Sequence, residues 1–141
     1  MDMQECFSPD MSPAQVREIS SLGLAHVGDA VYELLVRTWL CTHGRHTNKG
    51  MHRETVAMVR AAAQARAAAR LQETLTPEEQ EVYRRGRNTQ VHSVPKGADL
   101  ADYHAATGLE ALFGWLYLTG QGERLETLFR LALEEVRGHA S

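Results

Sequence analysis

Residues 24–41 read LAHVGDAVYELLVRTWLC, and this stretch decides the fold class. Its apolar residues recur every three or four positions, which predicts one long amphipathic helix. The rest of the 141-residue chain shows the same helical period. No run alternates apolar and polar residues with the β-branched enrichment typical of strands. The sequence therefore predicts an all-α protein that folds as a single compact helical bundle.

Capping residues set the expected helix boundaries. Ser12 followed by Pro13 predicts a short first helix that runs to about residue 22. A capping-box pattern at residues 76–79 predicts the start of another helix. The full set of expected helices is residues 13–22, 24–41, 48–71 with Asn48 as its cap, 77–87, 99–119 and 121–137.

Charge is distributed unevenly along the chain. Residues 1–36 carry a net charge of −5, residues 37–96 carry +6 and residues 97–141 carry −4, which together give −3. A positive segment between acidic ends suits contact with phosphates at one local surface, although arginines on alanine-rich helices also serve solubility alone.

Composition excludes several classes of protein. Two cysteines exclude a disulfide framework, and they show no zinc-type spacing. No apolar tract approaches the length of a membrane span, and the first residues show no secretory signal. We therefore expect a cytoplasmic protein without membrane association.

Two acidic residues stand within apolar helices, where a charge is costly unless it is paired or bound to a cation. Asp29 follows Gly28, and both residue types are unfavourable inside a helix. Glu110 stands within the apolar stretch 109–116. Small residues on both helices would let the axes approach, so that the two carboxylates face each other. Such a pair is a candidate Mg²⁺ site, able to polarise a phosphoryl oxygen and activate a water.

Other roles for these acids stay open at this point. Glu33 stands four residues before Arg37, in the order that favours a surface ion pair. Asp29 can equally cap or pair with an arginine, and Glu110 can be a buried acid with an arginine partner.

Four blocks of sequence then stand out in order along the chain. They are LAHVGDAVYE at 24–33, RGRN at 85–88, PK at 95–96 and YHAATGLEALFGWLYL at 103–118. Together they resemble Mini-ribonuclease III, the short bacterial branch of the ribonuclease III family that lacks the double-stranded-RNA-binding domain. The likeness runs from about residue 22 to residue 137. It implies a ribonuclease III-like catalytic domain over residues 21–141, preceded by an N-terminal extension and short helix over residues 1–20.

The resemblance also implies an activity. Members of this family are homodimeric endoribonucleases that cut double-stranded RNA with Mg²⁺, and they trim the paired ends of the 23S ribosomal RNA precursor. The aspartate of the first block and the glutamate of the last bind the catalytic metal in the family; these correspond to Asp29 and Glu110. A ribosomal protein is a further candidate partner. The competing hypothesis is a non-catalytic helical module of the same fold that binds RNA or the ribosome.

Three positions depart from familiar patterns. Ala25 and Thr107 stand where full-length ribonuclease III carries further acidic residues. The Mini branch also lacks acidic residues at these two positions. Only two metal-binding carboxylates are then expected. His26 replaces an aromatic residue that lies near the dimer contact in the family.

Positive and polar side chains are expected to hold the RNA, because an A-form duplex is bound mainly through its phosphates and 2′-hydroxyls. Gly86 is expected to permit close approach of the backbone there. The candidate RNA-binding residues are Lys49, His52, Arg53, Arg84, Arg85, Arg87, Asn88 and Lys96.

Overall fold

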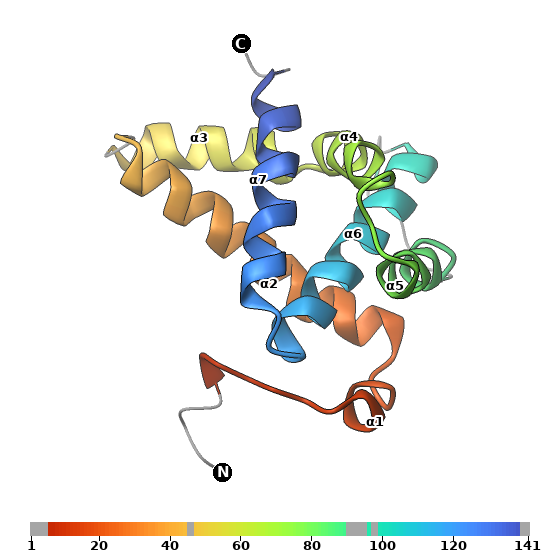
Figure 1. Ribbon diagram of the computed structural model, residues 1–141. Coiled ribbons are helices and arrows are strands. Elements are labelled where there is room, and N and C mark those ends of the chain that lie inside the picture. The colour runs from red at the N-terminus through yellow and green to blue at the C-terminus, as the bar shows by residue number, and fades with distance from the viewer. Residues whose placement is uncertain (1–5, 45–46, 90–95, 97–98, 139–141) are drawn as a thin grey trace.

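The computed structural model describes residues 6–44, 47–89, 96 and 99–138. Within these residues the chain forms seven α-helices and no strand, which confirms the predicted all-α fold. The helices are α1 (Pro13–Val16), α2 (Ser21–Thr42), α3 (Asn48–Val59), α4 (Ala61–Leu71), α5 (Pro77–Arg87), α6 (Leu100–Leu118) and α7 (Gly122–Gly138) (Figure 1). Over that part of the chain, no helix has the length and apolar character needed to cross a membrane.

Helix α6 is the centre of the bundle. It packs against α2, α4, α5 and α7, and its interface with α2 is the most extensive of these. Figure 1 shows α2 and α6 crossing in the middle of the molecule, with α7 passing in front of α2 in this view. Every residue of α6 from 106 to 116 is buried except Glu110, which is half-buried. This helix therefore carries most of the core and one acidic residue within it.

Two glycines set the distance between α2 and α6. A Cβ atom on Gly28 would lie 1.6 Å from the carbonyl oxygen of Glu110, and one on Gly114 would lie 2.0 Å from the carbonyl oxygen of Leu24. Both distances are far shorter than any real contact, and both involve backbone atoms that cannot move aside. Only glycine at these two positions lets the helices cross so closely. The close packing outweighs the roughly 1 kcal/mol that glycine costs inside a helix.

A second close approach joins α5 to α6. A Cβ atom on Gly86 would lie 2.7 Å from the Cβ of Ala111, and one on Gly108 would lie 2.8 Å from the ring of Tyr83. Gly86 is buried in this contact. The expectation that Gly86 allows the backbone to approach RNA is therefore wrong, because the glycine serves the packing of α5 on α6.

A buried ion pair fastens the start of α7 to α5. The Nε and Nη2 atoms of Arg124 donate to the two carboxylate oxygens of Glu79 at 2.8 and 2.9 Å, and Nη2 also donates to the carbonyl oxygen of Thr74 at 2.8 Å. Glu79 also completes the predicted capping box with Thr76. Burial acts to raise the pKa of Glu79, but hydrogen bonds from Arg124 and Thr76 hold it below its usual value. This carboxylate thus stays charged inside the fold.

The first predicted helix boundary is wrong. The helix expected to reach residue 22 ends at Val16, and α2 begins anew at Ser21. The cause is a second N-cap: the hydroxyl of Ser20 accepts a hydrogen bond from the backbone N–H of Gly23 at 3.0 Å.

The helix predicted over residues 48–71 is also wrong, because it is interrupted. Arg60 is extended, with φ −64° and ψ 156°, and separates α3 from α4. Thr47 rather than Asn48 caps α3, accepting from the N–H of Gly50 at 3.2 Å. The turn at Arg60 lets α4 bury its alanine face against α6 and α7.

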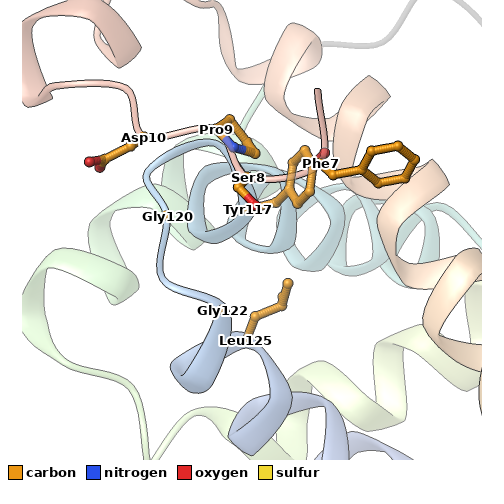
Figure 2. Close-up of a pocket in the computed structure, with 8 residues that line it drawn as sticks. All are labelled: Phe7, Ser8, Pro9, Asp10, Tyr117, Gly120, Gly122 and Leu125. Atoms are coloured by element: carbon orange, nitrogen blue, oxygen red, sulfur yellow. The ribbon is translucent and has the colours of Figure 1, made fainter. Parts of the chain in front are cut away.

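The segment before α1 packs on the end of α6. The hydroxyl of Tyr117 donates to the carbonyl oxygen of Cys6, and the N–H of Met11 donates to that of Leu118 at 2.8 Å. Figure 2 shows the resulting pocket of about 340 Å³, with the segment 7–10 on one side and Leu125 on the other. The N-terminal segment thus contacts the helix that carries Glu110, at its far end.

We expect Gly28→Ala to lower the free energy of unfolding by at least about 2 kcal/mol, because the added methyl group collides with backbone atoms of α6. Gly122→Ala is the matched control, since a Cβ there meets nothing within 4 Å; its effect should stay within about 1 kcal/mol. Urea denaturation followed by circular dichroism measures both. Equal stabilities of the two variants would contradict the close crossing.

Candidate active site

The crossing of α2 and α6 brings Asp29 and Glu110 together. Asp29 follows Gly28 on α2, and the backbone of Glu110 is what a side chain at Gly28 would strike. The two carboxyl groups are close enough to form a hydrogen bond when Glu110 carries a proton. Asp29 is exposed, whereas Glu110 is half-buried within α6. The pair therefore has one carboxyl group open to the surface and one held in the core.

The environment of Glu110 favours its neutral form. Burial, followed by the negative charge of Asp29 and the hydrogen bond to it, raises the pKa of Glu110 from 4.5 to about 8, against an opposing hydrogen bond from Gln64. At neutral pH Glu110 therefore keeps its proton beside the negative charge of Asp29. Two carboxyl groups held this close form a site in which a cation can replace that proton.

The donor set fits a small divalent cation. Mg²⁺ binds through one or two carboxylates and keeps several waters. No cluster of three or more His, Cys, Asp or Glu side chains that could hold a metal occurs among the residues described. Asp29 and Glu110 would thus supply the protein ligands, and water or substrate oxygens the remainder.

A pocket of about 310 Å³ opens beside Glu110. The residues lining it are Val59, Ala61, Gln64, Tyr103, Ala106, Thr107 and Glu110. The Nε2 atom of Gln64 donates to Oε2 of Glu110 at 3.3 Å and to the carbonyl oxygen of Val59 at 2.7 Å. The hydroxyl of Thr107 donates within α6, to the carbonyl oxygen of Tyr103 at 2.9 Å. The pocket gives solvent a path to the acid from the side of α4.

Gln64 is a residue that the sequence analysis missed. Its one signal is its position: it is the single polar residue among the buried positions of α4. Its neighbours in sequence are alanines, so that composition alone predicts a solvated helix. Its partner Glu110 lies far along the chain and becomes apparent only from the fold.

The structure distinguishes between the roles left open for the acids. Glu33 pairs with Arg37 at 3.0 Å, as the spacing predicts, and this pair lies on the surface. For Asp29 and Glu110, the described part of the chain shows no ion pair with lysine or arginine. The arginine-paired alternatives thus find no support among these residues.

Two of the arginines at the end of α5 share one acidic partner on the same helix. Glu81 accepts from Arg84 at 2.7 and 3.1 Å and from Arg85 at 2.9 Å. These bonds hold the pKa of Glu81 below its usual range. Sequence analysis missed this shared carboxylate, which neutralises part of the positive charge. The guanidinium of Arg87 lies 6.0 Å from the centre of the Tyr83 ring.

Helix α5 packs on α6 through Gly86, which contacts α6 at Thr107, Gly108 and Ala111. Both Arg87 and Asn88 are exposed, and the Nε of Arg87 donates to Oδ1 of Asn88 at 3.3 Å. These side chains are therefore open to solvent at the end of α5.

Four further candidate RNA-binding residues lie on α3 and at position 96. Lys49, His52 and Arg53 are exposed near the start of α3. Only the end of that helix, at Val59, reaches the pocket beside Glu110. At 1.5 Å per residue, the three side chains begin roughly 9 to 15 Å along the axis from Val59. Lys96 is exposed, and Pro95 lies outside the described residues.

Comparison with known proteins identifies the family of this chain. Residues 22–121 match the Ribonuclease III domain. The Mini-ribonuclease 3 of Symbiobacterium thermophilum is 47% identical over 113 residues, covering 80% of this chain and 87% of the relative. That of Thermoanaerobacter sp. is 41% identical over 121 residues, covering 86% and 85%. A crystal structure of a Fusobacterium nucleatum protein superposes with a TM-score of 0.75 at 26% identity, covering 84% of this chain and 95% of the other.

The chain therefore belongs to the ribonuclease III family, in its short Mini-ribonuclease III branch. It is an endoribonuclease of the class that acts on double-stranded RNA.

The raised pKa of Glu110 predicts how stability depends on pH. In the unfolded chain this carboxyl group loses its proton near its usual value of 4.5, whereas in the folded chain it keeps the proton to about 8. Between these values the folded state binds more protons, so the metal-free protein should lose stability as pH rises. The loss amounts to at most about 1.4 kcal/mol per pH unit.

Glu110→Gln should remove most of this slope, because the amide resembles the protonated carboxyl group and does not titrate. Urea denaturation across this pH range, with a chelator present, measures the free energy of unfolding of both proteins. An identical slope in the variant would show that Glu110 does not hold the raised pKa.

Proposed function

We propose that the protein is a Mg²⁺-dependent endoribonuclease whose catalytic centre is Asp29 and Glu110. The observation that carries this proposal is the contact between the two carboxyl groups at a crossing that only glycine permits. A fold that merely needed stability would be better served by apolar residues there, since two adjacent acids repel. The proposal matches the activity of the family to a particular site in this chain.

The two acids would share the work unequally. Asp29 and Glu110 would hold Mg²⁺, which would act as a Lewis acid on a phosphoryl oxygen and lower the pKa of a bound water. Asp29 is exposed and meets the RNA backbone at the surface, whereas Glu110 is held in one orientation by α6 and Gln64. Hydrolysis at this centre breaks the bond between phosphorus and the 3′ oxygen and leaves a 5′-phosphate and a 3′-hydroxyl.

The RNA duplex would be held by side chains around the carboxyl pair. Arg87 and Asn88 are exposed candidates at the end of α5, the helix that packs on α6 through Gly86. The candidates on α3 and at residue 96 would contact phosphates elsewhere along the duplex. The complete proposed set is Lys49, His52, Arg53, Arg84, Arg85, Arg87, Asn88 and Lys96.

The proposed substrate and assembly follow the family. We take residues 21–141 as the catalytic domain and residues 1–20 as an extension, and place the protein in the cytoplasm. The substrate would be the paired ends of the 23S ribosomal RNA precursor, with a ribosomal protein as a further partner. A homodimer is supported by apolar surface on α2, where Leu34 is 62% exposed and Leu22 is 41% exposed.

Asp29→Asn should reduce cleavage of a blunt RNA duplex by at least about a thousandfold, because loss of the metal's stabilisation is worth several kcal/mol. Duplex binding should persist, since the RNA is held by other residues. Glu33→Gln is the matched control, one turn away on the same helix and paired with Arg37; it should retain cleavage. Gel assays with and without Mg²⁺ measure both variants. Full activity in Asp29→Asn would refute the assignment of Asp29 to the catalytic centre, whereas no cleavage by the wild-type protein would favour the non-catalytic binding module.

Arg87→Ala should weaken duplex binding and lower the slope of log K against log salt by about 1, as expected for one lost phosphate contact. Arg85→Ala should change the slope less, because Glu81 already pairs with that side chain. Arg70→Ala, whose partner is Glu134 at 3.8 Å, serves as the control. Fluorescence anisotropy at several salt concentrations gives the slopes. An unchanged slope for Arg87→Ala would remove α5 from the interface.

A further inference from the structure

Gln64 lies beside Glu110, and its hydrogen bonding is incomplete, as is that of the buried hydroxyl of Tyr32. Gln64 is 3% exposed and lines the pocket next to Glu110. Its Oε1 atom is buried and has no hydrogen-bond partner in the structure. A buried amide oxygen without a donor is unfavourable, so its presence calls for a ligand or a role.

The orientation of the Gln64 amide follows from its neighbours. Both nearby polar atoms, the carbonyl oxygen of Val59 and Oε2 of Glu110, accept hydrogen bonds. The NH₂ group must therefore face them, because an oxygen in that place would oppose two further oxygens. Oε1 is then the end of the amide that needs a donor from elsewhere.

A purely structural role explains only half of this side chain. Val59 is the last residue of α3, and its carbonyl oxygen has no partner within that helix. The Nε2 atom of Gln64 satisfies it and so joins the end of α3 to the start of α4. An apolar residue would leave that carbonyl bare, but the structural role gives Oε1 no function.

We propose that Gln64 is a positioning residue of the metal site, whose Nε2 orients the Glu110 carboxylate and whose Oε1 accepts a hydrogen bond from a metal-bound water. This inference rests on the proposed Mg²⁺ site at Asp29 and Glu110. With two carboxylates as ligands, Mg²⁺ keeps several waters, and these are strong donors that need acceptors around them. Gln64 supplies a neutral acceptor in a site that has few acidic residues.

The test measures Mg²⁺ binding without RNA, through the rise in melting temperature of the full chain as MgCl₂ replaces NaCl at constant ionic strength. Gln64→Leu should increase, by about 10- to 100-fold, the Mg²⁺ concentration that gives half of the rise in melting temperature. This factor is the usual cost of losing a group that orients metal ligands. Gln64→Glu should lower that concentration, because a third carboxylate then faces the cation.

The control is Gln72→Leu, since the Nε2 of Gln72 also donates to a backbone carbonyl oxygen, that of Ala68 at 2.8 Å, at the other end of α4. It should respond to Mg²⁺ as the wild-type protein does. The inference would be overturned if the Gln64 variants melt at lower temperatures but need the same Mg²⁺ concentration for half of the rise in melting temperature. Gln64 would then have only a structural role. If Gln64→Glu does not fold, the comparison of Gln64→Leu with Gln72→Leu decides alone.

Asp29→Asn separates this inference from the proposed function. Loss of the Mg²⁺ response in that variant, together with an unchanged response in Gln64→Leu, refutes the role of Gln64 and keeps the metal site. A Mg²⁺ response that survives in Asp29→Asn refutes the metal site itself.

Discussion

The close crossing of α2 and α6 at Gly28 and Gly114 is the constraint on which the rest of the structure depends. With a side chain at either position, the two helix axes would have to separate, and the acids beside the crossing would separate with them. The packing that stabilises the core therefore also sets the distance between Asp29 and Glu110. Stability and the proposed chemistry share one contact, so a change in helix packing is also a change at the site.

That contact leaves the metal-free protein with an unfavourable arrangement. Glu110 holds its proton to about pH 8 because burial and Asp29 both oppose a second negative charge. Functional sites commonly store such unfavourable electrostatics, which a ligand then relieves. In the proposed function Asp29 and Glu110 would hold a divalent cation, which would relieve this arrangement by replacing the proton on Glu110. The buried pair of Glu79 and Arg124 shows the contrast, since its carboxylate is stabilised as an ion within the fold itself.

Local sequence signals predicted much of the fold and the pair of acids at the candidate site. The Thr76 capping box, the long helices and the unusual Gly28-Asp29 pair all follow from short-range preferences and from the cost of placing a charge among apolar residues. What the sequence could not predict depends on tertiary packing. The extended turn at Arg60 exists because α4 buries an alanine face, and Gln64 acquires its meaning only from Glu110, 46 positions away. The ion pairs of Glu81 with Arg84 and Arg85, by contrast, have helical spacing like that of Glu33 and Arg37, so the sequence could have indicated them.

The most direct measurement is anomalous X-ray diffraction from crystals of the protein grown with Mn²⁺ as a stand-in for Mg²⁺. The account predicts an anomalous peak bound by a carboxylate oxygen of Asp29 and one of Glu110, at the crossing of α2 and α6. Ordered side chains at both positions without a metal peak between them, or carboxyl groups that point apart, would contradict it.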